Sequence, residues 1–201
     1  MYDAGLGGKD SMYPTPGDTR LTYDDFLLFP DDGKRHEIID GEHYVTASPN
    51  TRHQVLAGRL HFEIELFLRQ HPGCGRVFLG PLDVVFTRWD VVEPDLLFVA
   101  VDQSEIVTDK NVQGSPALVI EVLSLGTRKT DEQIKRRLFE REGVREYWLV
   151  DPELDLVTVF RRKPDGSFPQ DAALTREARG VLTSPLMPGL AITLDDLFAA
   201  T

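Results

Sequence analysis

The chain has 201 residues, of which 41% are hydrophobic and 27% are charged, and this composition suits one soluble globular domain with a substantial core. Its formal net charge of −11 excludes a protein that coats nucleic acid through bulk positive charge, but it leaves local contacts to nucleic acid open. No apolar run approaches the roughly 20 residues that cross a bilayer, so we expect no membrane partner.

The N-terminal segment predicts an arm outside the fold. Residues 1–20 are rich in Gly, Pro, Asp and Ser, which is typical of a disordered or weakly docked segment, and they lack the basic start and apolar stretch of a secretory signal. Cys74 is the only cysteine, so the sequence has neither an internal disulfide nor a cysteine-based zinc site. We therefore expect a cytoplasmic protein with a single domain over residues 21–201, and a homodimer as its assembly.

The first third of the domain predicts a short helix, a hairpin and a long helix. Residues 22–30 favour the short helix, and residues 35–48 favour two strands around the turn Asp40-Gly41, which is a strong hairpin signal. The long helix spans 48–73, with Ser48 as its cap and Pro49 in its first position.

The rest of the domain predicts strands around a second helix. The expected strands are short, β-branched or aromatic stretches at 76–80, 82–87, 91–100, 117–124 and 145–170, with a last strand and a short helix within 184–200. The second helix covers 130–143, with Thr130 and Gln133 as a capping box. This order predicts an α+β or α/β fold with one central mixed sheet and helices packed on it.

Two carboxylates belong to strands that are otherwise apolar. Glu121 lies within "ALVIEVLS", whose two faces are both apolar, and Asp95 precedes the apolar run 96–99. Carboxylates on adjacent strands can converge, and magnesium is commonly held by one or two carboxylates together with water and phosphate oxygens. Alternatively, Glu121 pairs with a lysine or an arginine, and Asp95 caps a turn after Pro94.

Several stretches together resemble the Uma-two family of putative restriction endonucleases, within the PD-(D/E)XK nuclease superfamily. The resemblance covers about residues 22–162 and is carried by "HEIIDGE", "SPNTRH", "EPDLLFV", "PALVIEVLSLGTRKTDEQIK" and "GVREYWLVDP". It implies a restriction-endonuclease-like core, in which helices flank a mixed sheet, and cleavage of phosphodiester bonds that depends on Mg²⁺, with Mn²⁺ as a substitute. The implied substrate is nucleic acid, namely DNA.

The resemblance assigns the central residues of a site. Asp95 matches the aspartate of the "PD" motif and Glu121 matches the second acidic position, so both are expected metal ligands and catalytic residues. The lysine expected two positions after Glu121 is replaced by Leu123, and Lys135 is similar to a lysine that has moved to the following helix. The alternative for Lys135 is a stem that covers the core and a head that lies in water.

Three further residues are accessory candidates. Glu37 matches another acidic position of the family and is expected to assist catalysis, although a strand glutamate in water needs no such role. His53 matches a histidine near the start of the first long helix, where a structural role is the commoner one. Asp83 is a candidate of the same type as Glu37.

A basic stretch explains how an acidic chain could bind nucleic acid. Residues 128–141 contain six basic and three acidic side chains, and among the basic ones Lys129, Arg136 and Arg137 are the expected contacts to nucleic acid. The alternative is a solvated helix with ordinary ion pairs. Two other functions also remain open: a binding or structural protein of the same fold with weakened catalysis, and a metal-dependent phosphoesterase that acts on small nucleotides.

Overall fold

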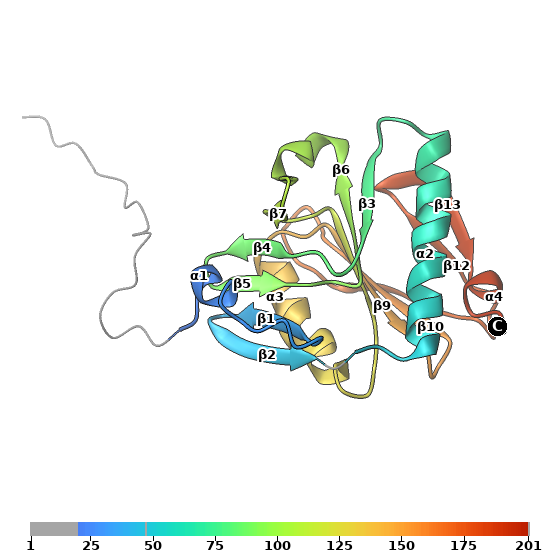
Figure 1. The fold of residues 1–201 in the computed structure, drawn as a ribbon. Coiled ribbons are helices and arrows are strands. Elements are labelled where there is room, and N and C mark those ends of the chain that lie inside the picture. Colours follow the sequence, from blue (N-terminus) through green and yellow to red (C-terminus); the bar gives the residue numbers. More distant parts are fainter. Residues whose placement is uncertain (1–19, 47, 201) are drawn as a thin grey trace, which may run out of the picture.

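The computed structural model describes residues 20–46 and 48–200, so the predicted arm lies outside the described residues except for Arg20. A six-stranded sheet with the order β11-β10-β9-β8-β6-β3 forms the centre of the fold (Figure 1). Its strands are Gln170–Thr175 (β11), Leu156–Arg161 (β10), Glu146–Asp151 (β9), Leu118–Val122 (β8), Leu96–Ala100 (β6) and Gly75–Leu79 (β3). Only the β8–β9 pair is parallel, so the sheet is mixed, as predicted.

A second sheet of five strands was not predicted. Its order is β2-β1-β5-β4-β7, and its strands are Glu42–Thr46 (β2), Arg35–Ile39 (β1), Asp90–Val92 (β5), Val84–Thr87 (β4) and Val112–Gln113 (β7). The predicted hairpin is confirmed, because β1 and β2 pair antiparallel around Asp40 and Gly41, which both have positive φ. Outside these two sheets, the chain forms Tyr23–Phe26 (α1), Val101–Ile106 (η1) and Leu194–Leu197 (α4), and a two-stranded sheet of Val181–Ser184 (β12) and Met187–Thr193 (β13).

The segment 93–95 carries the chain from one sheet to the other. The sequence suggested one strand over 91–100, but the structure divides it into β5 of the smaller sheet and β6 of the larger sheet. Pro94 lies between them, and a proline lacks the N–H that a continuous central strand would need. Asp95 is therefore the last residue before β6 and lies where the two sheets meet.

Two helical layers cover the opposite faces of the six-stranded sheet. Helix α2 (Thr51–Gln70) packs on one face, where Ile120 and Trp148 belong to its apolar core. Helix α3 (Arg136–Arg141) packs on the other face, in the core that contains Val119 and Tyr147. Successive strand residues alternate between the two cores, so Glu121 shares the α3 face with Val119. In the described ranges, no helix is both long and apolar enough to cross a membrane.

The helix starts differ from the predicted caps. Helix α2 is capped by Asn50, whose side chain accepts from the His53 N–H at 2.9 Å, so Ser48 and Pro49 precede the helix. The second helical segment begins at Arg128 and not at Thr130. Ser124 and Thr127 cap it reciprocally, since each backbone N–H donates to the other hydroxyl at 3.3 Å.

That helical segment contains a π-helical turn. It spans Thr130–Lys135 (η2) and runs directly into α3. The predicted capping box of Thr130 and Gln133 is wrong, because both residues already lie inside the helical segment. Gly143 follows the helix with φ 85°, as expected for a helix that ends in a left-handed glycine.

Candidate active site

Asp95 lies beside Glu121 because their strands are neighbours. Strands β6 and β8 are antiparallel with Leu96 opposite Ile120, and this register places Asp95 opposite Glu121. The Asp95 N–H donates to Glu121 Oε2 at 3.3 Å, and the Val122 N–H donates to Asp95 Oδ2 at 2.8 Å. Both carboxylates are buried.

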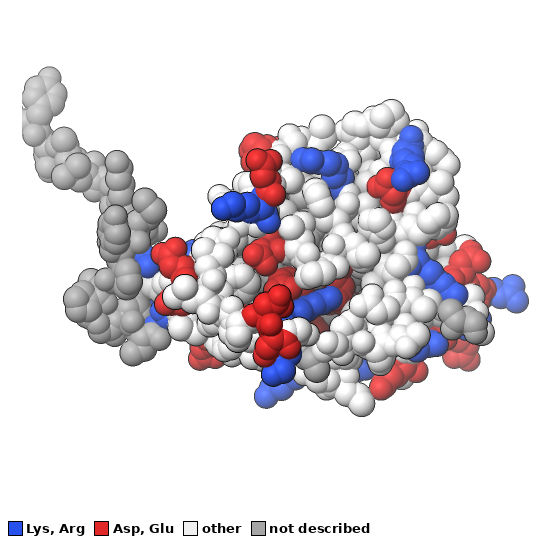
Figure 2. All heavy atoms as spheres, in the orientation of Figure 1, with Lys and Arg blue, Asp and Glu red and all other residues white. Residues whose placement is uncertain are grey.

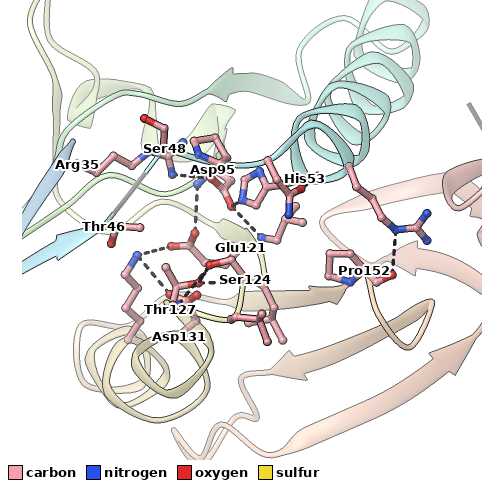
Figure 3. A pocket seen from close by; sticks show the side chains of 18 of the residues that line it. Arg35, Thr46, Ser48, His53, Asp95, Glu121, Ser124, Thr127, Asp131 and Pro152 are labelled. Atoms are coloured by element: carbon pink, nitrogen blue, oxygen red, sulfur yellow. Dashed lines mark hydrogen bonds and ion pairs between the residues drawn. The ribbon is translucent and has the colours of Figure 1, made fainter. Parts of the chain in front are cut away.

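Two side chains hold the Asp95 carboxylate from opposite sides (Figure 3). Arg35 Nη1 lies 2.5 Å from Oδ1, and His53 Nε2 lies 2.9 Å from Oδ2. Burial alone would raise the pKa of Asp95, but the hydrogen bonds and charges of His53, Arg35 and the Val122 N–H outweigh it and lower that pKa to about 2. Asp95 is therefore ionised at neutral pH.

Lys135 enters the site from the π-helical turn. Its Nζ lies 2.8 Å from Glu37 Oε1, 2.9 Å from Glu121 Oε1 and 3.5 Å from Asp131 Oδ1. Its side chain is only 5% exposed, so the head of this lysine does not lie in water. Although burial alone would lower the pKa of Lys135, the three carboxylates raise it well above its usual value.

Glu121 thus has the lysine partner that the alternative interpretation required, as well as the neighbouring aspartate that the metal interpretation required. Burial raises the pKa of Glu121 well above its usual value, and the charge of Lys135 opposes this shift. An uncompensated carboxylate here would be costly. The pair explains how the strand tolerates its one ionisable residue.

Two more carboxylates complete the buried cluster. Glu37, on β1, accepts from the Glu93 N–H at 2.9 Å with the same oxygen that faces Lys135. Asp131 lies one turn before Lys135 in η2, and burial raises its pKa to about 6. Both residues thus contact Lys135 and position its ammonium group beside Glu121.

His53 is placed by the first turn of α2. Its backbone N–H is held by the Asn50 cap, and its ring reaches Asp95 through Nε2. Its other ring nitrogen, Nδ1, is buried without a hydrogen-bond partner. A buried ring nitrogen without a partner is unusual, and no local sequence pattern predicts it.

A cavity of about 530 Å³ opens onto these side chains. Its walls come from the β1–β2 hairpin, the start of α2, the loop after β8 and the turn after β9, and its lining includes Arg35, Glu37, His53, Asp95, Glu121, Asp131 and Lys135. Figure 2 shows acidic side chains gathered near the hollowed centre of one face, with basic side chains among them. The cavity has the size of an ordinary ligand site.

The charges and donor atoms of the cluster fit a divalent cation. Four buried carboxylates face two cations, which gives a formal charge of −2 before His53 is counted; the carboxylates are Glu37, Asp95, Glu121 and Asp131, and the cations are Arg35 and Lys135. Carboxylate oxygens are the ligands that Mg²⁺ prefers, usually one or two of them with water and substrate oxygens. Over residues 20–46 and 48–200, no group of three or more His, Cys, Asp or Glu side chains is arranged to hold a metal. Asp95 and Glu121, the predicted ligands, are two neighbouring buried carboxylates of this cluster.

The other predicted residues lie outside the cavity. Asp83 does not line it, but the charge of Asp83 helps burial to raise the pKa of Glu93 to about 7. Lys129 and Arg137 are exposed, and the Arg136 guanidinium lies 5.5 Å from the centre of the Phe160 ring. None of the three basic residues lines the cavity, so any contact with nucleic acid would lie beyond its edge.

Sequence reasoning missed Arg35 and the role of Asp131. Arg35 and Glu37 are two residues apart on β1 and therefore point to the same face, which was a usable signal. Asp131 precedes Lys135 by four residues, a spacing that places both on one side of a helix. These spacings indicate a common site only if the hairpin and the helix converge on one point. Neither local pattern predicts that convergence.

Comparisons with known proteins identify the fold and the family of the chain. The structure is similar to that of "a putative nuclease belonging to DUF820" from Anabaena variabilis, with a TM-score of 0.73 and 21% identity over 89% of this chain and 98% of the other. At that identity, the likeness shows a common fold. No curated protein sequence matches the chain. The model of the Uma2 family, described as "Putative restriction endonuclease", matches residues 23–195, so the chain belongs to the Uma2 family of restriction-endonuclease-like nucleases.

Proposed function

We propose that this protein is an endonuclease that hydrolyses phosphodiester bonds of DNA and depends on Mg²⁺, with Mn²⁺ as a substitute. The observation that carries the proposal is the position of Asp95 and Glu121, which lie side by side at a cavity with Lys135 in contact with Glu121. The family description supports nuclease chemistry, and the description of its members as restriction endonucleases supports DNA as the substrate.

The proposed roles of the cluster residues differ. Asp95 and Glu121 would hold the metal, which when bound activates water and neutralises charge on a phosphate. Lys135 remains protonated because three carboxylates raise its pKa, so it acts as a hydrogen-bond donor and not as a general base. It would orient the attacking water or stabilise negative charge on the phosphate. Glu37 and Asp131 hold its ammonium group in place.

Cleavage assays with matched variants test the proposal. Plasmid, linear duplex, single-stranded DNA, RNA and small nucleotides are incubated with Mg²⁺, Mn²⁺ or EDTA. We expect cleavage of DNA with either metal, none in EDTA, and none with Asp95→Asn or Glu121→Gln. Lys163→Ala is the control, since Lys163 pairs with Asp171 on the surface, away from the cavity. Cleavage that survives in Asp95→Asn would exclude the proposed site, and cleavage of small nucleotides alone would favour the phosphoesterase.

One observation favours a second candidate, a binding protein of the same fold with weakened catalysis. Both oxygens of Asp95 already have partners, Oδ1 with Arg35 and Oδ2 with His53 and the Val122 N–H. A scaffold without metal chemistry would be stable in this state. Calorimetric titration with Mn²⁺ separates the two candidates, because only the nuclease should bind the ion through Asp95 and Glu121.

A further inference from the structure

Arg35 is more exposed and has fewer carboxylate partners than Lys135, the other cation of the cluster. Among the described residues, its guanidinium contacts one carboxylate, that of Asp95, and one backbone oxygen, the Glu93 carbonyl at 3.5 Å, a distance at the upper limit for a hydrogen bond. Its side chain is 21% exposed and lines the cavity, whereas that of Lys135 is 5% exposed and contacts three carboxylates. The Arg35 guanidinium can therefore turn into the cavity, whereas the ammonium group of Lys135 is enclosed by its three carboxylates.

The Arg35 contact and a metal ion compete for the same group. Asp95 Oδ2 already accepts from His53 and from the Val122 N–H, so Oδ1, bound by Arg35, is the less occupied oxygen. A cation that binds Asp95 through Oδ1 must displace the guanidinium or share that oxygen with it. Two positive charges beside one oxygen repel each other, and this repulsion favours release of Arg35.

A released guanidinium at the cavity wall is placed to bind a phosphate. Its planar fork of N–H donors matches the oxygens of a phosphate, and arginine is the side chain that proteins use most for such paired contacts. Arg35 and Glu37 leave β1 on the same side, and Glu37 contacts Lys135. Arg35 thus lies beside the carboxylates that would hold the metal, on the cavity where a phosphate would enter (Figure 3).

We propose that Arg35 has two alternating roles: it neutralises Asp95 in the metal-free protein in competition with the metal, and after displacement it binds a phosphate of the substrate. This inference rests on the proposed function, since it requires metal binding at Asp95. Bound metal would then raise the affinity for DNA, and bound DNA would raise the affinity for the metal, because the metal frees the arginine that the phosphate binds.

Replacing Arg35 should change the two affinities in opposite directions. In Arg35→Gln, Mn²⁺ measured by calorimetry without DNA should bind about tenfold or more tightly, as expected when one charge-assisted hydrogen bond no longer competes. Binding of a DNA duplex, measured in Ca²⁺ to prevent cleavage, should weaken. The slope of log affinity against log salt concentration should become shallower by about 0.9, the value for one phosphate contact. A purely structural role would weaken both affinities together.

Arg52→Gln is the matched control. Arg52 lines the same cavity but contacts the Pro152 carbonyl oxygen and Asp155, so its loss should leave Mn²⁺ affinity unchanged. A second measurement does not depend on a folded variant: saturating Mg²⁺ should shift the guanidinium NMR signals of Arg35 in the wild-type protein.

The outcomes separate this inference from the proposed function. If the wild type binds no Mn²⁺, the proposed metal site fails and the inference fails with it. If the wild type binds Mn²⁺ through Asp95 but Arg35→Gln binds it equally or more weakly, only the role of Arg35 is overturned. Unchanged Arg35 signals on addition of Mg²⁺, with bound metal confirmed by calorimetry, would also overturn it.

Discussion

Lys135→Met tests the buried charge cluster in a single change. Methionine keeps an unbranched side chain of similar length but removes the ammonium group that lies within 3.5 Å of Glu37, Glu121 and Asp131. Removing one partner of a buried ion pair costs about 3–5 kcal/mol, because it leaves uncompensated charge in the interior. For a chain of this size, each kcal/mol shifts the melting temperature by about 2–4 °C, so we expect a decrease of roughly 6–20 °C.

The assay is urea and thermal unfolding in EDTA at pH 8 and at pH 5. The loss should be smaller at pH 5, because burial raises the pKa values of Glu121 and Asp131 and their protonation removes the unpaired charge. Adding Glu121→Gln to Lys135→Met should recover part of the stability. Lys163→Met, on the surface, should change stability by less than about 1 kcal/mol. A loss below about 1 kcal/mol in Lys135→Met would show that Lys135 does not hold the cluster together.

Three further predictions concern the metal, pH and the basic helix. Mg²⁺ at about 100 times its Kd should stabilise the protein by about 2.7 kcal/mol, and Glu121→Gln should abolish that gain; an equal gain in the variant would remove Glu121 from the site. In EDTA, the free energy of unfolding should fall as pH rises from about 4 towards 7. The reason is that Glu93 (pKa about 7) and Asp131 (pKa about 6) bind protons more tightly in the folded than in the unfolded chain. In Glu93→Gln, the free energy of unfolding, measured in urea, should vary less with pH near the upper end of this range. Joint replacement of Lys129, Arg136 and Arg137 by alanine should reduce the salt dependence of duplex binding in Ca²⁺ by up to about 0.9 per lost contact, and an unchanged slope would exclude this surface.

Local patterns predicted most of the elements and the juxtaposition of the two strand carboxylates. The alternation of apolar residues around Glu121 identified a buried strand, and the turn Asp40-Gly41 identified the hairpin. Antiparallel pairing then placed Asp95 opposite Glu121, as two adjacent strands allow. The assignment of metal and catalytic roles to these residues stays a prediction.

The division into two sheets could not be predicted, because strand pairing depends on contacts distant in sequence. Pro94 is a local sign that the strand over 91–100 is interrupted, but no local pattern shows that β5 and β6 pair into different sheets. The helix starts were missed for a different reason. Ser48, Asn50, Ser124 and Thr130 all suit a cap, and the surrounding loop geometry decides which of them is used.

The arginine was missed because its importance is tertiary. Arg35 looks like an ordinary strand residue until the hairpin brings it to Asp95, 60 positions later in the chain. The burial of the Lys135 side chain was missed for the same reason, since helical spacing predicts the direction of a side chain but not which elements cover it. The π-helical turn, in which Asp131 and Lys135 both face the cluster, has no sequence signature that we recognise.

Anomalous scattering from a crystal soaked in Mn²⁺ tests the central claim most directly. A manganese peak should lie in contact with the carboxylates of Asp95 and Glu121, and it should disappear in a soaked crystal of Glu121→Gln. A soaked wild-type crystal in which Arg35 and Lys135 still hold these carboxylates, with no manganese peak between Asp95 and Glu121, would contradict a metal-dependent nuclease site.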